Sequence, residues 1–498
     1  MATPEKKAAL TQVSKGDLKR FVVQAALLRL IDPVRGEPTR TALDENPDLE
    51  ILSGQNLKQK FLDSFALICS TSSSGAETAS AVCLEQDAPT GTILRVARNR
   101  GLTPGDLAGL ERVLQILRVV AEKSMYFTSN PNVANAADDA NAADDAEKPS
   151  TQAEPEILRL VVELDRGRIL SIAENVEKRG VRKAIGDARS KFLSHQTKPE
   201  IRAIPGLKLW LENCPFTAAS PQTWSPTAIS KLITWSSQAR WDYPEQLQNF
   251  LGLDHTQKPL WLEGLHKIAR YRSAIKSMVK LAAKQPEIFA GIRIQEVEAP
   301  DPRPFSLRNE TAPLLAAVKE LVKEDSGMVM EQLEHRLSTQ NVEAQLRKAC
   351  RLSLTLHAEM QLVVFYEGNP SLAPRMPFIG TSKKACFLCH KYLQQHPLKL
   401  QVSACHQKIY PSWMPPPYYA VPGKFKSPPF MKLSKNIEQL TRRDLKVALT
   451  APRRPRNQDS TAGPSLTMSA TASVGLGSRQ GAKVQLALED GNTSEDSE

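Results

Sequence analysis

The chain has 498 residues, 41% of them hydrophobic, and a formal net charge of +11. This length allows two or three domains, and this composition is typical of a mostly globular protein with a buried core. No stretch approaches the roughly 18 apolar residues of a membrane span, and the N-terminus lacks the apolar core of a secretory signal. Seven thinly spread cysteines exclude a dense disulfide framework. We therefore expect an intracellular protein, nuclear or cytoplasmic, with no membrane partner.

Residues 1–130 form the first predicted region, which is mainly helical. KQKFLDSFALI and LERVLQILRVVAEK space their apolar residues for a buried helix face. Between these two helices, SAVCLEQ and GTILRVA are candidates for short strands.

Two segments have compositions that disfavour a packed core. Residues 131–156 contain NAADDA twice in tandem and almost no bulky apolar side chain. Burial there cannot offset the entropy lost on ordering, so we expect a low-complexity linker or loop insertion. The end of the chain is rich in Ser, Thr, Gly and Ala before an acidic tip. This composition predicts a disordered tail over residues 451–498.

Residues 157–290 form a predicted helical, tryptophan-rich region. Gly167 and Gly180 mark expected interruptions of its first long helix. The region carries five tryptophans, and aromatic residues in such patterns more often fill a core than stack on bases. In HKIARYRSAIKSMVKLAAK four basic residues lie four apart, and a solvated helix face explains them more simply than a phosphate contact. These residues are Arg272, Lys276, Lys280 and Lys284.

Positive charge is concentrated in residues 371–457, which hold 16 lysines and arginines against two carboxylates, Glu438 and Asp444. Such a segment can neutralise phosphates and gain from counterion release. A nucleotide or single-stranded nucleic acid is therefore an expected partner. A solubilising surface with a basic tail is the alternative that the sequence leaves open.

The residues that carry chemistry lie in LTLHAEMQLVVFYEG and ACFLC. His357 and Glu359 fall at the opening turn of one predicted helix, and Cys386 and Cys389 begin another. PFIGTSK between them predicts a buried strand, and LKLQVSACHQKIY predicts a further strand with its exit loop. This alternation predicts an α/β sandwich in which both candidate ligand pairs lie at helix N-termini along one sheet edge.

These side chains match the ligand chemistry of zinc. Zinc binds thiolate and imidazole in tetrahedral geometry, and three protein ligands leave one position for water. His357, Cys386 and Cys389 would supply the three ligands, and the positive helix ends favour thiolate. A water whose pKa falls to about 7 then provides hydroxide as the nucleophile. Glu359 would move protons from this water to the ring nitrogen and the departing amine.

At these residues the sequence resembles the zinc-dependent cytidine-deaminase-like superfamily, whose signature combines H-x-E with P-C-x-x-C. LHAEMQLVVFYE, PFIGTSKKACFLC and HQKIYP resemble more closely a fungal deaminase-like family related to bacterial toxin-type nucleic-acid deaminases. This resemblance covers roughly residues 290–420. It implies zinc ligands at His357, Cys386 and Cys389. It also implies a proton shuttle at Glu359. Ala385 stands where the broad signature has proline, so the loop that positions a substrate can differ.

The resemblance implies a deaminase-like three-layer α/β sandwich over residues 291–450, preceded by the mainly helical region. The first two strands of that fold are not evident in the sequence. GIRIQEVEA at residues 291–299 is one candidate, whereas residues 313–356 are more typical of helices. The expected function is zinc-dependent hydrolytic deamination of cytosine or adenine in a nucleotide or nucleic acid.

Two alternatives stay open at this stage. In one, the zinc module is a catalytically inactive scaffold and the helical region binds a partner. In the other, a closed zinc site only stabilises the domain. That site would combine Cys386 and Cys389 with Cys405 and His406, or with His390 or His396. Glu359 argues against both alternatives, because a purely structural site needs no carboxylate beside its ligands. Pocket shape and contacts to the exocyclic groups determine the base and the nucleic-acid type.

Overall fold

The computed structural model describes ten stretches of the chain. They are residues 10–39, 54–73, 77–88, 91–129, 149–194, 206–216, 220–251, 259–339, 341–419 and 428–447. The predicted tail 451–498 and residues 131–148 of the predicted linker lie outside the described residues. The last part of that linker is helical, because α6 (Pro149–Lys178) begins inside it and already buries Ala153. Among the described helices, none is both long and apolar enough to cross a membrane.

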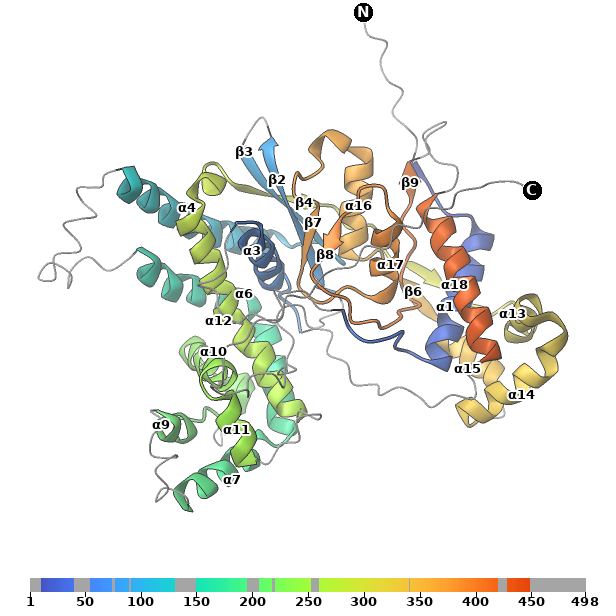
Figure 1. Cartoon of the computed structure of the whole chain (residues 1–498), viewed down its shortest axis with the longest axis horizontal. Coiled ribbons are helices and arrows are strands. Elements are labelled where there is room, and N and C mark those ends of the chain that lie inside the picture. The colour runs from blue at the N-terminus through green and yellow to red at the C-terminus, as the bar shows by residue number, and fades with distance from the viewer. Residues whose placement is uncertain are drawn as a thin grey trace, which may run out of the picture. The chain divides into compact units, whose positions relative to one another are not determined.

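The main sheet has five strands in the order β4-β3-β2-β7-β8 (Figure 1). Its central strand β2 pairs antiparallel with β3 and with β7, whereas β3 with β4 and β7 with β8 are parallel pairs. The strand bounds are β2 (Ser80–Ala88), β3 (Gly91–Arg98), β4 (Arg293–Val297), β7 (Phe378–Thr381) and β8 (Gln401–Val402). Two small sheets pair β1 (Leu10–Thr11) with β9 (Tyr418–Tyr419) and β5 (Arg303–Phe305) with β6 (Leu352–Leu354).

The hairpin β2–β3 supplies the two strands that could not be located in residues 291–450. It corresponds to SAVCLEQ and GTILRVA, whose apolar residues suit a sheet buried on both faces. The other candidate, GIRIQEVEA, forms β4 beside β3 at the edge of the same sheet. The predicted regions 1–130 and 291–450 therefore contribute strands to one sheet.

Helices make up most of the remaining described chain. Their bounds are α1 (Lys15–Ile31), α3 (Gly54–Ile68), α4 (Pro104–Ser129), α6 (Pro149–Lys178), α7 (Val181–Ser194), α9 (Leu207–Glu212), α10 (Pro226–Trp241), α11 (Pro244–Leu251), α12 (Leu260–Lys284), α13 (Pro313–Val322), α14 (Ser326–Leu337), α15 (Val342–Ala349), α16 (Ala358–Gly368), α17 (Phe387–Gln395) and α18 (Pro429–Lys446). Short 3-10 turns are η1 (Pro221–Thr223), η2 (Pro286–Phe289), η3 (Lys323–Asp325) and η4 (Pro370–Leu372).

The two glycines expected to interrupt the helix after the linker behave differently. Gly180 has a φ of +86° and separates α6 from α7, as predicted. Gly167 lies inside α6, so the interruption predicted there is wrong. A helix tolerates a glycine at a modest cost of about 1 kcal/mol, and the packing of α6 on both sides of Gly167 outweighs it.

Alternate residues of β2 enter two different cores, which shows that helices cover both faces of the sheet. Val82 and Leu84 pack in the core that includes α3, whereas Ala81 and Cys83 pack in the core that includes α16. Helix α3 contacts β2 and β7, and α16 contacts β2 and β3. The sheet is thus the middle layer of three, and the predicted α/β fold class is confirmed.

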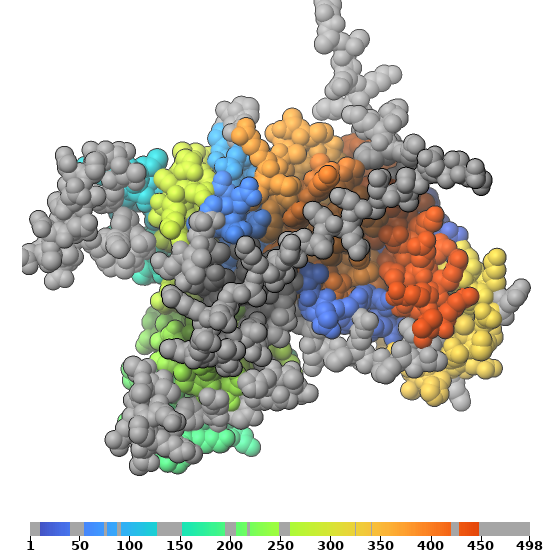
Figure 2. All heavy atoms as spheres, in the orientation of Figure 1, coloured from blue at the N-terminus to red at the C-terminus, as the bar shows by residue number. Residues whose placement is uncertain are grey.

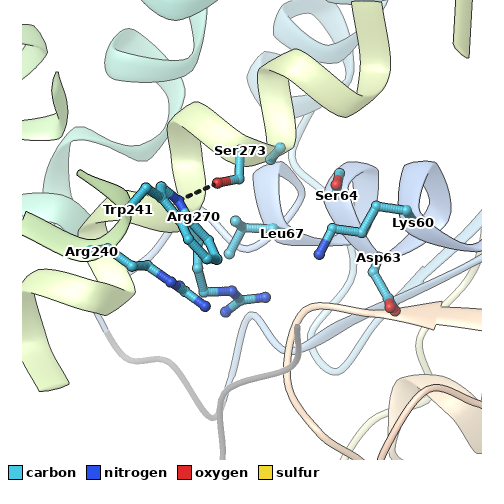
Figure 3. A pocket seen from close by; sticks show the side chains of 9 residues that line it. Lys60, Asp63, Ser64, Leu67, Arg240, Trp241, Arg270 and Ser273 are labelled. Carbon is cyan, nitrogen blue, oxygen red and sulfur yellow. Dashed lines mark hydrogen bonds between the residues drawn. The ribbon is translucent and has the colours of Figure 1, made fainter. Parts of the chain in front are cut away.

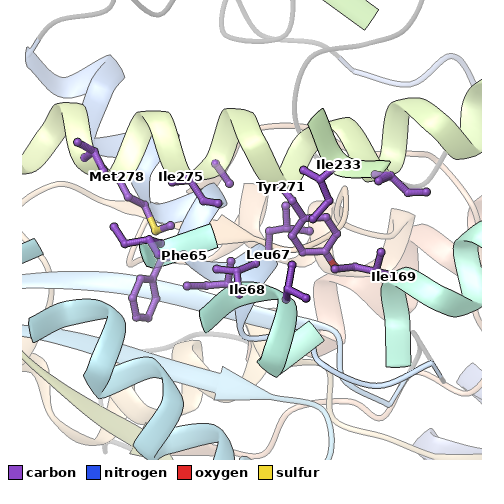
Figure 4. Packing of buried hydrophobic residues seen from close by; sticks show 14 of the residues in the cluster. Phe65, Leu67, Ile68, Ile169, Ile233, Tyr271, Ile275 and Met278 are labelled. Atoms are coloured by element: carbon purple, nitrogen blue, oxygen red, sulfur yellow. The ribbon is translucent and has the colours of Figure 1, made fainter. Parts of the chain in front are cut away.

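The α3 side of the sheet continues into a large helical core. Figure 4 shows Phe65 and Ile68 of α3 packed with Ile169 of α6 and with Ile275 and Met278 of α12. Burial of each such side chain contributes about 1.5–3 kcal/mol. Long helix α12 joins this core to α4, α6 and α10.

Most of the tryptophans of residues 201–265 belong to this helical core, as expected, whereas Trp241 is partly exposed. Four of them are 3–6% exposed: Trp210, Trp224, Trp235 and Trp261. Trp210 and Trp235 stack with ring centroids 4.5 Å apart. Each of their indole N–H groups donates to the other residue's carbonyl, at 2.9 and 2.8 Å. These rings are occupied by packing and leave no face for a base.

The opposite core contains the elements at both ends of the described chain. Helix α18 packs on α1, on α17 and on α13. Figure 2 shows α13 in yellow beside α18 in orange-red on one face. The predicted deaminase region therefore also draws on an N-terminal helix, α1, for its core.

Candidate metal centre

The opening turn of α16 is fixed to the end of strand β3. His357 caps this helix with extended backbone, φ −65° and ψ 150°. The Ala358 N–H donates to Asn99 Oδ1 at 2.8 Å, and the Gln361 side-chain amide donates to the Arg98 carbonyl at 3.1 Å. Asn99 directly follows β3, so the N-terminal hairpin positions both His357 and Glu359.

The opening turn of α17 follows the short buried strand β7. Cys386 is its N-cap residue, and its sulfur accepts from the Cys389 N–H at 3.3 Å. Ala385, which replaces the proline of the deaminase signature, donates its N–H to the Ala404 carbonyl at 2.9 Å and accepts from the His406 N–H at 3.1 Å. These backbone hydrogen bonds, which a proline could make only in part, hold the loop before the first cysteine.

The two helix starts bring one imidazole and two sulfurs together. His357 Nδ1 lies 3.4 Å from Cys389 Sγ and 3.7 Å from Cys386 Sγ. The three ligand atoms all lie within 4.8 Å of one another. Typical bond lengths of about 2.3 Å to sulfur and 2.0–2.1 Å to nitrogen place tetrahedral zinc ligands roughly 3.5–3.8 Å apart. The group could therefore hold a metal ion, and its spacing fits zinc.

Neighbouring groups support the sulfurs in the way expected around a metal. The Trp413 indole N–H donates to Cys389 Sγ at 3.3 Å. Trp413 is fully buried and stays in place through ring contacts with Phe21 and Tyr392. Donors to ligand sulfurs orient them and stabilise their charge.

The site favours one thiolate even without a metal. Burial opposes the ionisation of Cys386, but its hydrogen bond with Cys389 and the charge of His357 hold its pKa well below the ordinary value. Burial and the neighbouring Cys386 raise the pKa of Cys389 well above it. For His357, burial lowers the pKa but Cys386 raises it, and the result is a raised pKa. A thiolate is the form in which cysteine binds metals.

Glu359 lies next to these ligands on the accessible side. Burial raises the pKa of its carboxyl above the ordinary value, although the charge of His357 acts in the opposite direction. His357 and Glu359 are partly exposed, whereas Cys386 and Cys389 are only 3% and 0% exposed. An incoming molecule would therefore meet the imidazole and the carboxylate, with the sulfurs behind them.

The closed zinc site considered above does not form. Within the stretches that the structure describes, His357, Cys386 and Cys389 make the only group of three or more suitably spaced ligand atoms. His396 Nε2 instead contacts Glu367 Oε1 at 2.8 Å. The ring nitrogen Nδ1 of His406 accepts from the Lys408 N–H at 3.0 Å. These interactions occupy one ring nitrogen of His396 and one of His406.

Sequence reasoning missed Tyr410, which lies at the site. Its ring is 6.3 Å from that of His357 and 5.5 Å, edge to face, from that of His406. Burial raises the pKa of Tyr410, and lowers that of His406 to about 4, so His406 is neutral at physiological pH. His406 is only 3% exposed, so the ring of Tyr410 packs against a buried neighbour. The motif HQKIYP contained the tyrosine, but its direction depends on the loop conformation.

Residues 356–417 match the family model of OTT_1508-like deaminases. The matched residues contain α16, β7, α17 and β8, and hence the whole His–Cys–Cys group with Glu359. This match supports a deaminase-like family for that part of the chain. No curated protein matches the chain, and no solved structure does so either.

Proposed function

We propose that the protein is a zinc-dependent hydrolytic deaminase that acts on a base, cytosine or adenine, in a nucleotide or nucleic acid. One observation carries the proposal: an imidazole and two sulfurs at tetrahedral spacing lie beside a partly exposed carboxylate with a raised pKa. The family match at residues 356–417 supports the same chemistry. A structural metal site gains nothing from that carboxylate.

In the proposed reaction, water replaces the exocyclic amino group of the base, and ammonia leaves. His357, Cys386 and Cys389 would hold the metal, which when bound supplies Lewis acidity and lowers the pKa of a coordinated water to about 7. A Glu359 carboxylate oxygen would accept a proton from the attacking water. It would donate that proton to the ring nitrogen, then accept the remaining proton of the added hydroxyl group and donate it to the leaving amine. A raised pKa favours this return of protons near neutral pH.

Tyr410 is the aromatic face that the site offers to a base. Its partly exposed ring lies beside His357, and the buried His406 fixes its orientation. A base stacked on an aromatic ring gains about 1–3 kcal/mol. We assign Tyr410 the role of positioning the base against the metal ligands.

A Glu359→Gln variant tests the proposal, with Glu331→Gln as the matched control. Glu331 is an exposed residue of α14 and does not touch the metal site. Zinc content would be measured by mass spectrometry. Ammonia release would be measured with nucleosides, nucleotides and single-stranded DNA and RNA. We expect both variants to bind one zinc per chain, and Glu359→Gln alone to lose activity by at least about 100-fold, as for a general acid–base.

Two results would contradict parts of the proposal. If zinc-loaded wild-type protein releases no ammonia from any of these substrates, the module is an inactive scaffold. If His357→Ala retains its full zinc content, the metal is held elsewhere and the assigned ligand set is wrong.

A further inference from the structure

A positively charged cavity lies next to the loop that leads into the metal site. It has a volume of about 250 Å³, far above the roughly 10–15 Å³ that one water requires. Its lining includes Arg168 of α6, Lys267 and Arg270 of α12, and Lys383 from the loop after β7. Ser171 and Asn175 of α6 add polar side chains, and none of the described residues that line the cavity is a carboxylate.

The cavity is built into the fold and is more than a cluster of surface lysines. Arg168 and Arg270 are 9% and 8% exposed, and Arg168 donates to the Ser70 carbonyl at 2.7 Å. Like charges close together repel each other unless an anion or water separates them. Lys383 is affected in this way. Burial has the largest effect on its pKa, and the charges of Arg168 and Lys267 add to it, so that the pKa is lowered to about 8.

A second, smaller cavity adjoins the first and shares Leu67 and Arg270 with it. Figure 3 shows that Lys60 of α3 points toward Arg240 and Arg270 across this space, whereas the carboxylate of Asp63 points toward a neighbouring strand. Asp63 is the carboxylate here. It accepts the Thr381 N–H at 2.8 Å, and burial raises its pKa to about 6. The cationic groups of the two cavities thus come from α3, α6, α10, α12 and the loop after β7, and the one carboxylate among the described lining residues, Asp63, is buried against the sheet.

Lys383 connects the cavity to the metal site. It lies three residues before Cys386, so the Cα atoms of the two residues are at most about 11 Å apart. One nucleotide can span such a distance between its base and its phosphate. The positive charge of Lys383 also acts on His357.

We infer that this cavity binds a phosphate group of the substrate, so that residues of the helical region help the metal module to select phosphorylated substrates. The inference rests on the proposed deaminase function. It assigns the contact with the phosphate to α6 and α12 together with Lys383. Helix α18 is less suited, because Arg442 pairs with Glu438 and Arg443 with Asp444.

The test compares two lysines of the same helix. Lys267→Glu changes the cavity lining, whereas Lys276→Glu places the same charge on an exposed part of α12 that does not line it. Titration calorimetry would measure the affinity of inactive Glu359→Gln protein for nucleoside 5′-monophosphates, the matching nucleosides, and mixed-sequence single-stranded DNA and RNA. Lys267→Gln with Lys276→Gln is the milder pair if the charge reversal unfolds the protein.

We expect Lys267→Glu to weaken binding of phosphorylated probes by at least about tenfold, and Lys276→Glu by less than about twofold. With the single strands, the slope of log affinity against log salt should fall by about 1 for Lys267→Glu. Mononucleotides that bind as tightly as single strands would identify a free nucleotide as the source of the phosphate. Much tighter binding of single strands would identify nucleic acid.

Other results separate this inference from the proposed function. Equal losses in the two lysine variants, or no binding of any phosphorylated probe, would overturn the phosphate site. Deamination of nucleoside 5′-monophosphates at the same rate in wild type and Lys267→Glu would leave the enzyme but remove the phosphate site. Binding that depends on Lys267 without ammonia release by the wild type would keep the phosphate site and reject the deaminase.

Discussion

Lys383 stands between the cationic cavity and the metal site, and its protonation affects what the cavity can bind. Its pKa of about 8 lies below the ordinary lysine value because of burial and the nearby charges of Arg168 and Lys267. Arg270 of α12 also lines the cavity, and His357 lies on the metal side. At pH 7 Lys383 is mostly a cation, and above pH 8 it becomes mostly neutral.

We predict that phosphate affinity falls as pH rises above about 8. The cation is the form that binds an anion, and the bound anion raises the pKa of Lys383. The decline should therefore begin near pH 8 and reach at most tenfold per pH unit. Titrations of a nucleoside monophosphate from pH 6.5 to 9.5 would measure it. Lys383→Met should bind more weakly at pH 7 and show a flatter profile. A wild-type affinity that is constant to pH 9.5 would contradict the prediction.

Helix α3 and strand β7 approach each other closely at Gly380. An added Cβ there would lie within 2.5 Å of the Cβ and the backbone oxygen of Leu62 on α3. Backbone cannot move aside as a flexible side chain can, so the helix would be pushed away from the strand. Because β7 leads directly into the cysteine loop, this contact also sets the position of the sulfurs.

We predict that Gly380→Ala destabilises the protein by about 1–3 kcal/mol or more. Gly167→Ala is the control, since an added Cβ on exposed Gly167 of α6 meets no atom within 4 Å. Alanine there should stabilise the helix by up to about 1 kcal/mol. Urea unfolding of both variants would compare the free energies. Equal changes in the free energy of unfolding for the two substitutions would contradict the prediction, because α3 and β7 could then separate to admit the methyl group at little cost.

Elements with local signals could be predicted from the sequence, and those with distant partners could not. The apolar spacing of α3, α4, α12 and α16 is contained within each helix. The start of α17 after strand β7 could likewise be predicted locally, but the start of α16 is held at Asn99 after β3, because β6 pairs with β5 outside the main sheet. The partner of β7 is different. Ala81 pairs with Thr381 across a long stretch of intervening chain, and no local pattern specifies that pairing.

At the scale of the whole molecule, one sheet unites strands from distant parts of the chain. The pairing of β2 with β3 and β7 joins residues 80–98 to residues 378–381. The chain between β3 and β4 forms the helices of the large core and supplies Arg168 and Lys267 to the cationic cavity. The helical region is therefore packed into the metal module and contributes to the pocket next to it.

This arrangement predicts that residues 291–450 do not fold when expressed alone. The fragment lacks β2 and β3, so β7 loses a partner and its buried edge becomes exposed. It also lacks Asn99, whose side chain holds the opening turn of α16. We expect no cooperative thermal transition and no stoichiometric zinc binding for the fragment, measured by circular dichroism and mass spectrometry.

The control is the chain from residue 10 to residue 447, which retains every described element and should bind one zinc and unfold cooperatively. Residues 54–100, added as a separate peptide, restore α3, β2, β3 and Asn99. They should recover part of the zinc binding of the fragment, but less than the intact chain, because joining two chains costs association entropy. A fragment that alone binds one zinc with a sharp transition would mean that the metal module is autonomous. The hairpin would then be an addition to a sheet that folds without it.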